Sequence, residues 1–216
     1  MSTHRSFFNR RLHSLLGVIP VGFFLLEHLW TNYHATQGAA AFEEKVNWLW
    51  DIPFLAVLEI FFIFLPLMYH GVYGLYIAFT AQNNVGNFGT FRNVMFMLQR
   101  VTGVITLIFV TIHVWQTRLQ VALNDMSAAD LSHQTAEVLS NPINVILYLI
   151  GIVAAVFHFS NGMWSFLVSW GITVGPRAQR VSTWIWMGVF VLLSYIGIQA
   201  MLAFTSPEFT SMLAHR

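Results

Sequence analysis

Residues 91–115 read FRNVMFMLQRVTGVITLIFVTIHVW, a mostly apolar stretch that contains Arg100 and His113. About 20 largely apolar residues are enough for a helix to cross the hydrocarbon core of a bilayer. The stretch therefore predicts a transmembrane helix over about residues 95–118, with a histidine inside the span. Four other stretches have the same character. They cover about residues 12–33, 54–79, 142–170 and 182–205.

The composition also indicates a membrane protein. Hydrophobic residues make up 56% of the 216 residues and charged residues 9%, against roughly 25% charged residues in an ordinary soluble domain. Five spans leave little room for anything outside the bilayer, so we expect one all-α membrane domain over residues 1–216. The first span is too long for the apolar region of a signal peptide, and we expect it to be retained.

The basic residues predict the orientation, because arginine and lysine favour the cytoplasmic side in short loops. With a cytoplasmic N-terminus, seven basic residues lie in inner segments and three in outer segments. In this orientation seven acidic residues lie in outer segments and none in inner segments, which agrees with a cytoplasmic N-terminus. The inner basic residues are Arg5, Arg10, Arg11, Arg92, Arg100, Arg177 and Arg180, and the outer ones are Lys45, Arg118 and Arg216.

Four histidines lie inside four different spans. At about 1.5 Å of rise per residue, His28 lies about 24 Å above the inner end of the first span, and His70 lies about 13 Å above the inner end of the second. His28 is therefore expected in the outer half of the bilayer and His70 in the inner half. The same reckoning places His113 in the outer half and His158 in the inner half. The predicted pairs are His28 with His113 and His70 with His158.

An internal repeat supports this pairing. The first and third spans share an arginine, a Gly-Val-Ile and a histidine, and the second and fourth share His-x-x-x-Gly followed by an aromatic residue. The histidines of each hairpin are separated by 42 and 45 residues. Two similar hairpins that face each other would bring one histidine of each half together. Arg11, residues 17–19 and His28 of the first span match Arg100, residues 103–105 and His113 of the third. His70, Gly74 and Tyr76 of the second span match His158, Gly162 and Trp164 of the fourth.

Two pairs of histidines at two depths predict two haems. Imidazoles on facing helices are a common way to hold an iron porphyrin, and a glycine one turn from the histidine, as at Gly74 and Gly162, leaves space for the macrocycle. Arg11 and Arg100 at the inner helix ends, aided by His13, are candidates to neutralise the propionates. Because the chain has no cysteine, covalent haem attachment, an iron–sulfur cluster and a disulfide are excluded, and the haems are expected to be of the b type.

For any one of these histidines, a simpler role is a hydrogen-bonded packing residue of a membrane helix. Intramembrane ionisable groups are costly and are usually functional, so four at matched positions favour the haem interpretation. His13 lies near the inner interface, where it can also simply extend toward water. The remaining histidines lie in expected loops or tails and are interpreted as solvated surface residues. They are His4, His34, His133 and His215.

The chain resembles the cytochrome b membrane anchor of succinate dehydrogenase, in the form with one large anchor polypeptide and two haems that occurs in menaquinone-using Gram-positive bacteria. The resemblance covers nearly all of the chain, and the outer loops and last residues match least. Its segments are RRLHSLLGVIPVG at 10–22, LPLMYHGVYGLYIAFTAQNN at 65–84, FRNVMFMLQRVTGVITLIFVTIHVW at 91–115 and HFSNGMWSF at 158–166.

The resemblance implies five helices, axial ligation by the four histidines and a place in the bacterial cytoplasmic membrane. It implies two soluble partners on the cytoplasmic face, a flavoprotein with the succinate site and an iron–sulfur protein, near the loops 81–93 and 173–180. Electrons would then pass through both haems to menaquinone. Proton delivery to the quinone is a hypothesis for Glu27 and Glu59, which lie in the outer halves of their spans, and a neutral packing role for these acids is an equal alternative.

Other functions stay open from the sequence. A different dihaem quinone cytochrome, such as the anchor of a hydrogenase or a formate dehydrogenase, would share the His-x-x-x-Gly helices. A proton-coupled transporter with a histidine relay and a structural anchor poor in haem also have intramembrane histidines. The same layout would serve fumarate reduction with quinol as the donor.

Overall fold

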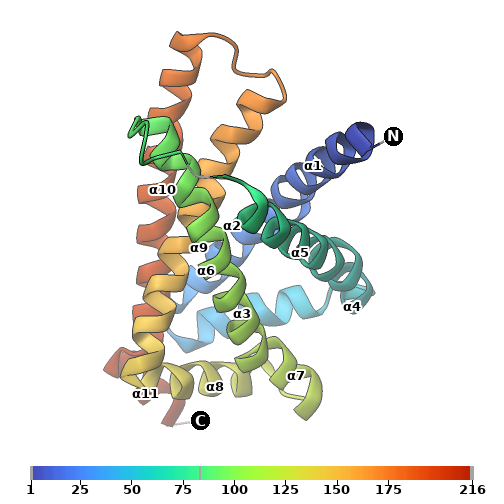
Figure 1. Cartoon of the computed structure of the whole chain (residues 1–216). Coiled ribbons are helices and arrows are strands. Elements are labelled where there is room, and N and C mark those ends of the chain that lie inside the picture. The colour runs from blue at the N-terminus through green and yellow to red at the C-terminus, as the bar shows by residue number, and fades with distance from the viewer. Residues whose placement is uncertain (1, 83, 215–216) are drawn as a thin grey trace. The chain divides into compact units, whose positions relative to one another are not determined.

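The computed structural model describes residues 2–82 and 84–214, and in this part of the chain the backbone forms helices and no strand. This confirms the predicted all-α fold. His215 and Arg216 lie outside the described residues, and so do the side chains of His4 and Arg5. The elements (Figure 1) are α1 (Ser2–Val18), α2 (Pro20–Tyr33), η1 (His34–Gln37), α3 (Ala39–Trp50), α4 (Leu55–Leu58), η2 (Glu59–Phe64), α5 (Leu65–Thr80), α6 (Phe91–Gln116), α7 (Arg118–Asn124), α8 (Ala128–Ser140), α9 (Pro142–Ser169), α10 (Pro176–Phe204) and α11 (Pro207–Ala214).

Among the described residues, five helical segments are long and apolar enough to cross a membrane. Each overlaps one predicted span almost completely, so the chain is a multi-pass membrane protein. Some segments begin earlier than predicted, because their polar first turns continue the helix beyond the apolar window. The segments are Ser6–Gln37, Leu55–Thr80, Phe91–Asn124, Pro142–Ser169 and Pro176–Ala203.

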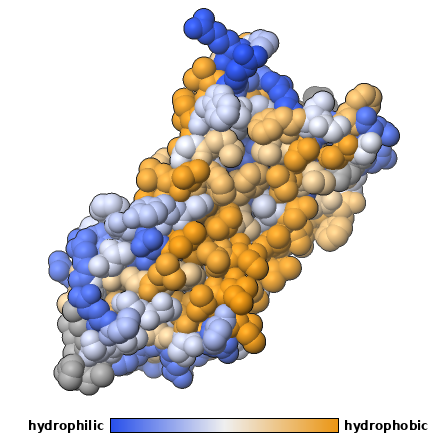
Figure 2. Space-filling view, turned by 90° about the vertical axis from the view of Figure 1, so that its left-hand side faces the viewer, coloured by the Kyte–Doolittle hydropathy of each residue, from blue (hydrophilic) through white to orange (hydrophobic). Residues whose placement is uncertain are grey.

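The outer surfaces of these helices are apolar. Large side chains such as Phe23, Phe61 and Val191 are more than half exposed, and Figure 2 shows a broad hydrophobic area on one face. Contiguous apolar surface of this extent would be unfavourable in water and is what a lipid-facing surface requires.

Two prolines change the helix geometry inside the spans. α1 ends at Val18 and α2 begins at Pro20, because proline has no N–H to continue the hydrogen-bond ladder. The six-residue π-helical segment η2 comes just before Pro66, and the N–H of Leu65 bonds to the carbonyl of Ile60. A proline ring also clashes with the carbonyl four residues earlier, which the wider winding relieves.

Contacts divide the described chain into two compact units. Unit 1 contains the residues up to 25, 56–105 and 154–191, and unit 2 contains 26–55, 106–153 and the residues from 192 onward. In unit 1, α1 contacts α5 (Figure 1).

Unit 2 contains short helices that the sequence analysis did not predict. α3, α8 and α11 pack on one another around a core that includes Phe42, Phe204 and Phe209. The ring centroid of Phe204 lies 5.0 Å from that of Phe42 and 4.9 Å from that of Phe209, and both contacts are edge-on. α8 begins with a capping box between Ser127 and Asp130, a sequence signal that predicts a helix start.

Candidate functional site

His70 and His158 lie side by side in unit 1, as the depth argument predicts. Their ring centroids are 6.0 Å apart, and the ring planes are nearly perpendicular, at 84°. His70 lies on α5 and His158 on α9. We call these two residues the 70/158 pair.

Each ring of the 70/158 pair is held by a backbone carbonyl of a neighbouring helix. The Nδ1–H of His70 donates to the carbonyl of His13 at 2.9 Å, and the Nδ1–H of His158 donates to the carbonyl of Gln99 at 2.9 Å. A hydrogen bond from one ring nitrogen to a carbonyl fixes the tautomer and leaves the other nitrogen free as a ligand. The Nε2 atom of each ring is therefore the one available to a metal.

Two glycines of the repeat make room for these rings. A Cβ atom at Gly17 would lie 2.5 Å from the Nδ1 atom of His70 and closer still to its Cε1 atom, and one at Gly103 would lie 2.8 Å from the Cε1 atom of His158. Normal carbon contacts are about 3.5–4.0 Å. Both rings thus lie directly against a helix backbone where no side chain fits.

Gly74 and Gly162 face a different neighbour. A Cβ atom at Gly74 would lie 3.2 Å from the Nε2 atom of His13, and one at Gly162 would lie 3.2 Å from the Nε2 atom of Gln99. His13 and Gln99 thus hold equivalent places in the two hairpins. The ring of His13 stacks on His70 with centroids 4.0 Å apart.

The Gln99 side chain is connected to His158 and to α9. Its Nε2 donates to the carbonyl of His158 at 2.9 Å, and its Oε1 accepts from Asn161 at 2.7 Å. Asn161 also donates to the carbonyl of Met95 at 3.2 Å. Gln99 and Asn161 were not predicted as site residues, although uncharged polar residues in apolar spans commonly hydrogen-bond between helices.

His28 and His113 lie side by side in unit 2. Their ring centroids are 5.6 Å apart, with the planes at 74°. His28 lies on α2 and His113 on α6. Asn32 donates to the carbonyl of His28 at 2.8 Å and lies beside its ring. We call these two residues the 28/113 pair.

The ring of His113 is surrounded by aromatic side chains. Phe109 stacks on it with centroids 5.6 Å apart, and Tyr148 meets it edge-on at 5.6 Å. The Nδ1 atom of His113 lies 3.3 Å from the hydroxyl of Tyr148. A Cβ atom at Gly151 would lie 2.6 Å from the Cδ1 atom of Phe109, so this glycine makes room for that ring.

The residues of both pairs fit a haem. An imidazole nitrogen binds a transition metal at about 2 Å, so two rings on one ion have centroids roughly 6 Å apart. Among the described residues, no three His, Cys, Asp or Glu side chains gather to hold a bare metal ion. Two protein ligands per site suit a metal that brings four more from its own macrocycle.

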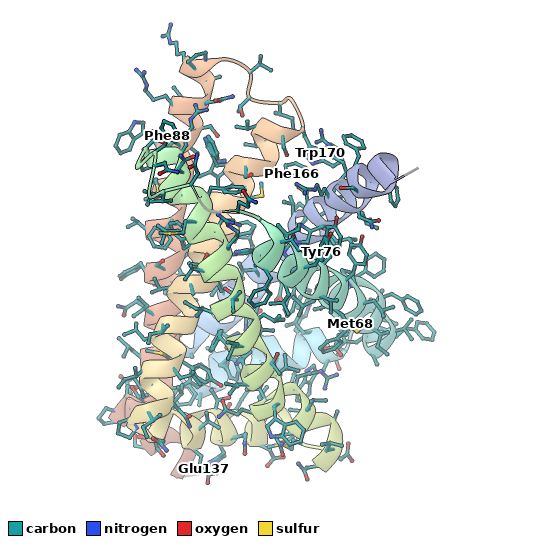
Figure 3. All side chains as sticks on the ribbon, in the orientation of Figure 1. Met68, Tyr76, Phe88, Glu137, Phe166 and Trp170 are labelled. Atoms are coloured by element: carbon teal, nitrogen blue, oxygen red, sulfur yellow. The ribbon has the colours of Figure 1, made fainter. Side chains whose placement is uncertain are left out.

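The two candidate propionate arginines have other neighbours in unit 1. The guanidinium of Arg11 lies 5.2 Å from the ring centroid of Phe7 and 5.1 Å from that of Trp170, which is labelled at the end of α9 in Figure 3. Arg100 donates to the carbonyl of Ala81 at 2.9 Å and thereby satisfies a carbonyl at the C-terminal end of α5. Their role toward propionates stays a prediction.

Glu27 and Glu59 lie in different units. Glu27 accepts a hydrogen bond from the hydroxyl of Thr31, one turn later, at 2.5 Å, and Thr31 is buried. Glu59 is the first residue of η2 and is half-buried. Proton delivery by either acid stays a prediction.

The sequence matches known proteins over most of its length. Residues 84–197 match the protein family described as Succinate dehydrogenase/Fumarate reductase transmembrane subunit. The chain is similar to the Succinate dehydrogenase cytochrome b558 subunit of Bacillus subtilis (strain 168), with 53% identity over 204 residues that cover 94% of this chain and 100% of the relative. No solved structure gives a significant match.

Proposed function

Because the chain belongs to the family of succinate dehydrogenase and fumarate reductase transmembrane subunits, we propose that it holds two haem b groups and links an iron–sulfur partner to menaquinone. It is a homologue of the succinate dehydrogenase cytochrome b subunit and the membrane anchor of an oxidoreductase complex. The single observation that supports the haem assignment is the presence of two histidine pairs, one in each unit.

The 70/158 pair would hold one haem and the 28/113 pair the other, in one dihaem domain formed by the whole chain. Bound haem supplies one-electron redox chemistry at an iron whose potential depends on its axial ligands and their hydrogen bonds. The carbonyls of His13 and Gln99 hold the Nδ1 atoms of their partners, which directs both Nε2 atoms to the metal. Arg11, Arg100 and His13 are the proposed contacts of the propionates, and Gly74 and Gly162 provide space.

The N-terminus is proposed to lie in the cytoplasm, because most basic residues then lie on the cytoplasmic side. The flavoprotein and iron–sulfur subunits would dock on this face, against the loops around residues 81–93 and 173–180. These loops carry arginine and no acidic residue, which suits an acidic partner surface.

Menaquinone is proposed to react near the 28/113 pair, on the side away from the soluble subunits. Glu27 and Glu59 are the candidate proton donors. A Glu59→Gln complex with unchanged quinone reductase turnover would remove Glu59 from this proposal.

Haem content per polypeptide in the purified complex tests the proposal, with two haems as the expected result. We expect His70→Ala and His158→Ala to remove the same spectral component, and His28→Ala and His113→Ala to remove the other. His133→Ala, at an exposed position of α8, is the matched control and should keep both. Loss of one shared component by His28→Ala and His70→Ala would refute the pairing.

The second candidate function is fumarate reduction, which the family description includes. It uses the same anchor with electrons moving in the opposite direction, from quinol. Comparing succinate-dependent quinone reduction with quinol-dependent fumarate reduction in one purified complex decides between the two directions.

A further inference from the structure

The hydroxyl of Tyr148 lies between His113 and Gln116 in the interior of unit 2. Tyr148 is 5% exposed. Its oxygen lies 3.3 Å from the Nδ1 atom of His113 and 3.1 Å from the Oε1 atom of Gln116. A buried phenol with two polar neighbours has a defined orientation.

The number of protons determines the direction of these bonds. A tyrosine hydroxyl has one proton, and Tyr148 donates it to Gln116 Oε1, which can only accept. The phenol oxygen must therefore accept the Nδ1–H of His113. The Nε2 atom of His113 is then the free ligand atom, as in the 70/158 pair.

The neighbouring packing keeps this geometry in place. Phe109 stacks on His113 and meets the ring of Tyr148 edge-on at 5.2 Å. Gln134 on α8 donates to the backbone carbonyl of Gln116 at 3.3 Å. The backbone of the residue that accepts the Tyr148 proton is thus hydrogen-bonded to a second helix.

The acceptor differs between the two pairs. In the 70/158 pair, both Nδ1 atoms donate to backbone carbonyls at 2.9 Å. His113 donates instead to a side chain, over the longer distance of 3.3 Å. A point substitution can remove this acceptor without moving the backbone.

We propose that Tyr148 is a positioning residue for His113 and that its phenol oxygen sets the donor strength of that ligand toward the iron. The proposal rests on the proposed haem ligation by His113. A hydrogen bond from Nδ1–H makes the imidazole a stronger electron donor, which favours the ferric form. Tyr148 therefore lowers the potential of the iron in the 28/113 pair.

The test is a redox titration of the purified complex with Tyr148→Phe, which keeps the ring and removes the hydroxyl. We expect two haems per chain, a shift of the 28/113 component to more positive potential and no shift of the other. Tyr195→Phe, at an exposed position in the same unit, is the matched control and should shift neither. The His113→Ala spectrum identifies the component.

Unchanged potentials in Tyr148→Phe, or equal shifts of both components, would overturn the proposal. If the Tyr148→Phe complex loses haem, the same redox titration of a Gln116→Leu complex tests the proposal instead. Removing the Gln116 acceptor weakens the polarisation of the phenol, so a smaller positive shift of the same component supports the proposal, and no shift overturns it. If His113→Ala removes no haem component, the haem assignment itself fails, whatever Tyr148→Phe does.

Discussion

Replacing Gly17 with alanine is expected to displace His70 and to weaken haem binding at the 70/158 pair. The new Cβ atom would lie 2.5 Å from the Nδ1 atom of His70, which is about 1 Å inside the normal contact distance. The ring cannot simply swing away, because its Nδ1–H is bound to the carbonyl of His13. Either the ring or the helix must move.

The magnitude follows from these contacts. Overpacking of a close-packed site costs about 1–3 kcal/mol, and an unsatisfied buried N–H adds about 1–3 kcal/mol. Alanine returns about 1 kcal/mol through its higher helix propensity. A net loss of about 3 kcal/mol corresponds to roughly a hundredfold weaker haem affinity. Gly103→Ala places its Cβ atom 2.8 Å from His158 and should act in the same direction with a smaller effect.

The assay is haem content and the reduced visible spectrum of the purified complex after extended dialysis against a haem-binding protein. Gly188→Ala is the matched control, because a Cβ atom there would have no heavy atom within 4 Å. We expect Gly17→Ala to lose the component that His70→Ala loses, and Gly188→Ala to lose none. A Gly17→Ala complex with normal haem retention would refute the close approach of His70 to this helix.

The remaining predictions concern unit 2. Gly151→Ala would place a Cβ atom 2.6 Å from the Cδ1 atom of Phe109 and closer still to the Cγ atom, so haem loss should be confined to the 28/113 component; loss of the other component would contradict this. Ser127→Ala should destabilise α8 by about 1 kcal/mol through the lost N-cap, measured by hydrogen exchange, with Ser127→Asn close to wild type. Hydrogen bonds from the Ser127 side chain and backbone lower the pKa of Asp130. The stabilisation of α8 by the Asp130 carboxylate is therefore complete above the pKa of an unfolded aspartate and is lost as the pH falls through the lowered pKa of Asp130 in the folded chain. Exchange protection of α8 that does not change in acid would refute this.

The depth of each histidine could be predicted because a helix has a constant rise per residue. His28 and His113 are neighbours in unit 2, and His70 and His158 are neighbours in unit 1, as the predicted pairing requires. Their role as ligands stays a prediction. The break at Pro20 could also be predicted, since the missing N–H is a property of the residue itself.

The short helices α3, α8 and α11 were missed because their apolar faces are too short to indicate a span. They are stabilised by packing on one another and on Phe204 of α10. Such helices depend on tertiary contacts more than on their own propensity. The capping box at Ser127 and Asp130 was a usable signal for α8 alone.

Apolar length and residue spacing are one-dimensional quantities, so the number of spans, the pairing of the histidines and the family could be read from the sequence, and the height of each histidine in the bilayer stays a prediction. The folded chain shows which atom three of these imidazoles contact: a carbonyl for His70 and for His158, and a phenol for His113. It also decided that Gly17 and Gly103 lie beneath the rings of their partners. These contacts depend on how each helix is rotated about its axis against its neighbour, and spacing along one chain does not specify that rotation.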